Sequence, residues 1–265
     1  MAILRINELF LDDENKASEY FNNLIQEKDL EILDQLFLFT EVALGELNHK
    51  IKNTEFPDYS IELYLGFTYN LLTTSYSLLR CGYMAAAQII MRSALEYISL
   101  CMYFFEFPED EKIYRNSHKR FNLKLEAKKY PRWVQGYLRR IDTEGRVFKD
   151  IGNLNWEKLI FINLIEEASK FTHPNLDFVF TSIFLQSDLE SKKDYFSLGP
   201  KGNDDYNTRN TYWRIVESSI YLHLVLKTVF KRYMVTRSSE VFTKAIHALN
   251  DAKVKSKLEF ESDNS

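Results

Sequence analysis

Glycine, proline and cysteine are scarce in this chain of 265 residues, which has 8, 5 and 2 of them respectively. Because glycine and proline mark turns, their scarcity indicates long elements with few connections and argues against a β-sandwich or barrel. Cys81 and Cys101 stand at the two ends of one helical pattern, beyond the reach of a disulfide. Free thiols in apolar surroundings are typical of a reducing compartment. We therefore expect an α-helical, cytoplasmic protein.

Motifs for metals, cofactors and targeting are also missing from the sequence. No pair of its 5 histidines or 2 cysteines has metal-ligand spacing, so we expect no metal site and no cofactor. The stretch Gly199-Pro200-Lys201-Gly202 lacks the spacing of a phosphate-binding glycine loop. The first residues, MAILRINELFLDDENK, have neither the apolar core nor the cleavage site of a signal peptide.

Apolar residues recur at helical spacing along most of the chain. The helices expected from this pattern cover residues 7–22, 28–51, 61–80, 82–107, 132–141, 156–172, 175–185, 210–235 and 238–253, and a further helix is expected to begin at Pro108 and end at Pro131. The short connection Cys81-Gly82 predicts that 61–80 and 82–107 form an antiparallel pair. The polar segment 187–208, which contains two glycines and a proline, is expected to be a loop.

The fold class that follows is all-α, a single-domain helical bundle. Residues 1–58 are expected to form N-terminal helices that pack on the core, and 59–253 to form the bundle itself. The last residues, 254–265, are expected to be a flexible tail.

Residues 82–107 form the most apolar segment, GYMAAAQIIMRSALEYISLCMYFFEF. A helix that is apolar all round is buried in a protein core or in a membrane. The segment is long enough to span a bilayer, but Arg92 and Glu96 would then lie near its centre, at a cost of about 3 kcal/mol each. We therefore expect the central buried helix of a bundle and no membrane partner.

Gln88, Arg92 and Glu96 lie four residues apart and form one polar line along this helix. Buried ionisable side chains are costly unless they are paired. Arg92 and Glu96 therefore have two interpretations. They form either a buried ion pair that fixes helix register, or part of a cleft in which Arg92 holds an anion and Glu96 orients it.

Basic residues are concentrated between Lys112 and Arg140, where ten lysines and arginines accompany one acid, Glu126. This region carries +9 in a chain of net charge -4, so the remainder carries -13. Aromatic residues are interleaved with the charges, as in surfaces that combine phosphate contacts with base stacking. The alternative is a solvated basic face that neutralises acidic neighbours across the bundle. The candidate phosphate-binding residues are Lys112, Arg115, Lys119, Arg120, Lys124, Lys128, Lys129, Arg132, Arg139 and Arg140.

His173 ends an expected helix and precedes Pro174. The helix dipole favours a charged imidazole at this position. His173 could act as an acid or base beside Arg92 and Glu96, which would require all three within reach of one substrate proton. Alternatively, it could cap the helix by bonding its last carbonyls.

Two short motifs resemble a pattern found in bacterial helical proteins. Arg92, Ser93 and Glu96 match an R-S-x-x-E element, and a later helix ends in S-x-x-x-H-P at Ser169, His173 and Pro174. On these motifs, residues 60–235 resemble the HEPN-like group, some of whose members act in abortive infection and toxin–antitoxin systems. Ribonucleases of that group carry an arginine followed a few residues later by a histidine at one helix end, and this chain lacks that spacing.

The expectation is a HEPN-like bacterial protein, in phage defence or a toxin–antitoxin system, that binds RNA or nucleotide phosphates through the basic region. Any enzymatic activity would be metal-independent and nuclease-like, with Arg92, Glu96 and His173 as catalytic residues. The alternative is a non-catalytic module that binds a protein partner or oligomerises. A homo-oligomer is consistent with the large apolar content of the bundle.

Overall fold

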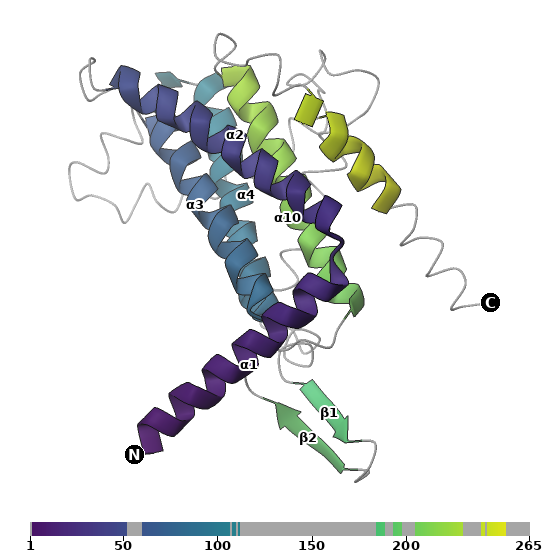
Figure 1. Ribbon diagram of the computed structural model, residues 1–265. Coiled ribbons are helices and arrows are strands. Elements are labelled where there is room, and N and C mark those ends of the chain that lie inside the picture. Colours follow the sequence, from purple (N-terminus) through teal and green to yellow (C-terminus); the bar gives the residue numbers. More distant parts are fainter. Residues whose placement is uncertain are drawn as a thin grey trace.

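A computed structural model describes residues 2–51, 60–106, 108–109, 111, 184–188, 193–197, 205–229, 240–241 and 243–252 of the chain. These residues form a bundle of long helices, which confirms the all-α prediction (Figure 1). The labelled helices are α1 (Ala2–Leu24), α2 (Glu27–Ile51), α3 (Ser60–Arg80), α4 (Met84–Glu106) and α10 (Asp205–Val229). Residues 243–252 add a further helical segment. Among the described helices, none is both long enough and apolar enough to cross a membrane.

The helices α3 and α4 form the expected antiparallel hairpin, and Gly82 shapes its turn. Gly82 has a φ of 83°, a left-handed conformation that glycine adopts without steric cost. Its N–H donates to the carbonyl of Leu79, and the N–H of Tyr83 donates to the carbonyl of Leu78. This pair of bonds is the Schellman arrangement, which satisfies the last carbonyls of α3. The turn therefore ends α3 and reverses the chain within three residues, since α4 begins at Met84.

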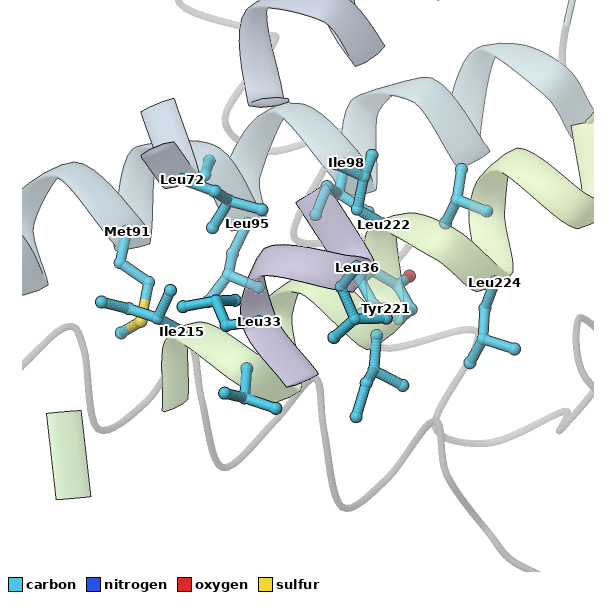
Figure 2. Close-up of a cluster of buried hydrophobic side chains, with 14 of the residues drawn as sticks. Leu33, Leu36, Leu72, Met91, Leu95, Ile98, Ile215, Tyr221, Leu222 and Leu224 are labelled. Atoms are coloured by element: carbon cyan, nitrogen blue, oxygen red, sulfur yellow. The ribbon is translucent and has the colours of Figure 1, made fainter. Parts of the chain in front are cut away.

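The core lies between α2, α3, α4 and α10, and α10 is enclosed on all sides over part of its length. Every residue from Ile215 to Leu226 is buried. Met91 of α4 packs beside Ile215, and Leu33 of α2 lies close to the same helix (Figure 2). Two serines inside this stretch, Ser218 and Ser219, donate their hydroxyls to backbone carbonyls one turn earlier, at 2.8 Å each. These bonds allow polar side chains to remain in the core.

The prediction that 82–107 is the central helix holds for one side of α4 only. Met91, Leu95 and Ile98 face the core and are fully buried, whereas Ile89 and Phe105 are exposed. α4 therefore borders the bundle, and α10 occupies its centre. The sequence conceals this because α10 carries several polar residues and is less apolar on average than α4.

Contacts between aromatic rings and one hydrogen bond to a backbone carbonyl join the N-terminal helices to the bundle. Phe21 of α1 contacts Tyr76 and Tyr212 edge-on, with ring centroids 6.0 and 6.1 Å apart. Tyr212 donates its hydroxyl to the carbonyl of Asp29 in the first turn of α2, at 2.5 Å. Edge-on ring pairs stabilise beyond their buried area, by about 1 kcal/mol each. Residues 2–51 thus dock on α3 and α10 through a shared aromatic cluster.

The segment predicted as a loop, 187–208, is partly regular. Strands β1 (Phe184–Asp188) and β2 (Lys193–Ser197) pair in antiparallel register, with Phe184 opposite Ser197. Residues 184 and 185, expected at the end of a helix, therefore belong to β1, and α10 begins earlier than expected, at Asp205. The aromatic pair Tyr195-Phe196 favours a strand, whereas the glycines and the proline between residues 199 and 202 are typical of a loop.

Candidate functional site

The polar line on α4 passes from the core to the surface within two turns. Gln88 is buried between α4 and α10, at 3% exposure. The Arg92 side chain is 19% exposed and that of Glu96 is 50% exposed. The line therefore begins inside the bundle and ends in solvent. The gradient follows from helix geometry, because residues four apart are rotated by about 40° around the axis and the line drifts from the core side of α4 to its outer side.

Arg92 and Glu96 are paired, as their four-residue spacing predicts. Arg92 Nε lies 3.2 Å from Glu96 Oε1. Among the described residues Nε makes no hydrogen bond, so the N–H is not aligned with that oxygen. Because Glu96 remains half exposed, the pair is not the fully buried ion pair considered from the sequence. A partly exposed pair of this kind contributes about 0 to 1 kcal/mol to stability.

Gln88 is the member of the line that connects two helices. Its Nε2 donates to Thr211 Oγ1 of α10 at 2.7 Å, and both side chains are buried. Its Oε1 is also buried and has no hydrogen-bond partner among the described residues. A buried amide with one unbonded end is costly, so its remaining bond is a sensitive point of the core. The bond joins residues 123 positions apart, and no sequence pattern marks Thr211.

The other predicted site residues lie outside the described part of the chain. His173 falls there, as do the ten basic residues from Lys112 to Arg140. Arg92 and Glu96 are therefore the predicted site residues that the structure brings together. Their convergence with His173 stays a prediction.

A contact that the sequence does not predict anchors α1. Tyr83, at the turn between α3 and α4, donates its hydroxyl to Glu14 Oε1 at 2.8 Å. Burial, reinforced by this carboxylate, raises the pKa of Tyr83 to about 12. The side chains of α1 that pack inward, Ala17 and Phe21, follow on the same helix. A single aromatic and a single acid, 69 residues apart, carry no periodic signal that could have predicted the bond.

Two further features bear on chemistry at this site. The described residues contain no group of three or more His, Cys, Asp or Glu side chains that could share a metal ion. Cys101 is fully buried on α4, and this burial raises the pKa of its thiol well above the ordinary value. The described part of α4 therefore offers a cation and a carboxylate at its surface and an inert thiol inside.

Comparisons with protein-family models, with curated proteins and with solved structures found no match to this chain.

Proposed function

We propose that this protein binds RNA or nucleotide phosphates through the basic region Lys112–Arg140. The observation that carries the proposal is the separation of charge along the chain. Residues 1–62 contain 14 acids and 5 bases, a net charge of -9, whereas the basic region carries +9. A local positive charge of this size in an acidic chain attracts polyanions and would be neutralised by phosphates.

The interleaved aromatic residues favour a nucleic acid over an acidic protein as the partner. Tyr114, Phe121, Tyr130, Trp133 and Tyr137 lie among the lysines and arginines. Stacking of a base on an aromatic ring contributes about 1 to 3 kcal/mol per base and tolerates any sequence. The proposed binding is therefore strong in its salt dependence and weak in its sequence preference.

The helical bundle provides a rigid attachment point for the basic region. α4 ends at Glu106, and its last turns are held in the core by Cys101 and Phe104, both fully buried. The basic region begins six residues after this anchored end. The fold and defence role implied by the HEPN-like resemblance belong to the same proposal, with Arg92, Glu96 and His173 as its candidate catalytic residues.

A titration of single-stranded RNA by fluorescence anisotropy tests the proposal across a range of salt. The logarithm of the binding constant should fall linearly with the logarithm of salt concentration, by about 0.7 per phosphate neutralised. The variant Lys128→Gln/Lys129→Gln should lower that slope by about 1.4. The control Lys16→Gln/Lys28→Gln removes two exposed lysines from α1 and α2 and should leave the slope unchanged.

Catalysis can be separated from binding and from folding in the same material. Because the Arg92–Glu96 pair is partly exposed, Arg92→Ala should change stability by only about 0 to 1 kcal/mol. Loss of RNA cleavage in Arg92→Ala and His173→Ala, with thermal stability retained, would support the candidate catalytic residues. Absence of RNA binding even at low salt would overturn the proposed function and favour the alternative, a non-catalytic protein-interaction module.

A further inference from the structure

The α3–α4 hairpin has an outer face, on the side away from the core, that is apolar at its centre. We call it the hairpin outer face; it comprises Leu63, Phe67, Asn70 and Thr74 of α3 and Ile89, Ser93, Glu96 and Tyr97 of α4. Leu63 is 60% exposed and Phe67 is 46% exposed. α3 has no charged residue from 63 to 79. Large apolar side chains that gather on one exposed face mark an interaction surface.

The two helices of this face are held in a fixed register. The rings of Phe67 and Tyr97 meet edge-on, with centroids 4.9 Å apart. Farther along the hairpin, Ser75 Oγ donates to the carbonyl of Ala87 at 2.7 Å. Phe67 is therefore level with Tyr97, about 4.5 Å along the helix axis from the midpoint between Arg92 and Glu96.

Charge selects the partner of this face. Arg92 and Glu96 lie along its edge in the order positive then negative from the N-terminus of α4, which is the less favourable order within one helix. Two copies of α4 that cross antiparallel about the midpoint of this pair would place each arginine opposite the other copy's glutamate. The face is thus complementary to itself under a two-fold rotation.

The outer face of α2 provides a contrast. It also exposes two large apolar side chains one turn apart, Leu38 and Val42, with Leu38 at 58%. They are flanked by the exposed acids Glu31, Asp34 and Glu41. Pairing this face with a second copy would bring like charges together, which is destabilising. Exposed apolar area alone therefore does not distinguish the two faces. The arrangement of charges favours the hairpin outer face as the one that pairs with a second copy.

We propose that the hairpin outer face binds the same face of a second copy of this chain. The two-fold axis runs across α3 and α4, between Arg92 and Glu96. Each α3 and α4 packs against its counterpart in the antiparallel direction, so the two hairpins stack face to face as two layers of two helices. Arg92 pairs with the partner's Glu96, and the two Phe67 rings meet near the axis. This interface does not depend on phosphate binding by the basic region.

Sedimentation velocity across a wide concentration range tests the proposal. The wild-type chain should convert from the 31.4 kDa monomer to a species of twice that mass as concentration rises. Phe67→Asp places a charge at the centre of the face and should weaken dimerisation by about 30-fold or more, as at an interface hot spot. Leu38→Asp changes an apolar residue of α2 that is even more exposed than Phe67; it is the matched control and should leave dimerisation unchanged.

Charge exchange distinguishes the two-fold contact from the pair within one helix. Arg92→Glu brings two carboxylates together across the axis and should weaken dimerisation by about tenfold or more. The double exchange Arg92→Glu/Glu96→Arg restores both contacts and should restore dimerisation. A monomer at every concentration would overturn the proposal. So would equal effects of Phe67→Asp and Leu38→Asp, or a double exchange that dissociates like the single one, in variants whose circular dichroism matches the wild type.

Discussion

Replacing Thr211 by valine tests the buried bond between α4 and α10. Valine keeps the shape of threonine and removes only the hydroxyl that accepts from Gln88 Nε2. The other end of the Gln88 amide, Oε1, already lacks a partner among the described residues. Thr211→Val would therefore leave a buried amide bonded at neither end. The expected loss of unfolding free energy is about 1 to 3 kcal/mol.

The companion variant Gln88→Leu should cost less than Thr211→Val. Leucine removes both ends of the amide, including the buried oxygen that has no partner. The hydroxyl of Thr211 only accepts from Gln88, so its proton can still donate to a backbone carbonyl one turn earlier, as those of Ser218 and Ser219 do in the same helix. We expect a loss below about 1 kcal/mol for Gln88→Leu, and a double variant close to wild type.

Urea unfolding, followed by circular dichroism, measures the unfolding free energy of the wild type, the two single variants and the double variant. An unchanged m-value would indicate that the folded and unfolded states keep their exposed surface, so that midpoints convert directly into free energies. Because the double variant should be close to wild type, the coupling between the two positions should equal the sum of the two single losses, about 1 to 4 kcal/mol. The reasoning fails if Thr211→Val changes stability by less than about 0.5 kcal/mol. It also fails if the losses of the two single variants simply add.

Three further outcomes are expected. Leu36→Ala, at a fully buried position of α2, should lower the unfolding free energy by about 2 to 5 kcal/mol, whereas Leu38→Ala two residues away should change it by less than about 0.5 kcal/mol; equal urea midpoints would contradict the assigned orientation of α2. Because burial and Glu14 raise the pKa of Tyr83 from 10.0 to about 12, the folded state keeps a proton that the unfolded state releases, so stability falls as pH rises between these values. Tyr83→Phe should make that decline shallower in unfolding measured across the same interval, and an unchanged slope would refute the assignment. An alkylating reagent should modify the half-buried Cys81 in the native protein but Cys101 only after unfolding, which mass spectrometry would detect; native labelling of both would contradict the burial of Cys101.

Local pattern predicted the helices well, because their signals lie within a few turns of sequence. The apolar period over 61–80 and the glycine at 82 suffice to predict the α3–α4 hairpin. Which helix is enclosed could not be predicted in the same way. The burial of α10 depends on helices more than 100 residues earlier in the chain, and its serines meet their hydrogen-bonding needs within the helix.

In the candidate site, only contacts within a single helix could be predicted from the sequence. Spacing alone placed Arg92 beside Glu96, and the structure confirms their contact. It could not give their exposure, because that depends on which side of α4 the other helices of the bundle cover. Thr211, the partner of Gln88, was missed for the same reason. His173 and the basic region remain predictions from the sequence.

The central position of α10 has a consequence for synthesis of the chain. Helices α1 to α4 are complete by residue 106, yet the helix that fills the space between them begins at Asp205. Until α10 has been synthesised, the apolar faces of the earlier helices that it will cover remain exposed on the nascent chain. Contacts such as Asp29 with Tyr212 close loops of 183 residues, which slows folding relative to a bundle built from successive hairpins. A nascent chain halted before residue 205 should therefore aggregate or recruit chaperones, although α1 to α4 have already been synthesised.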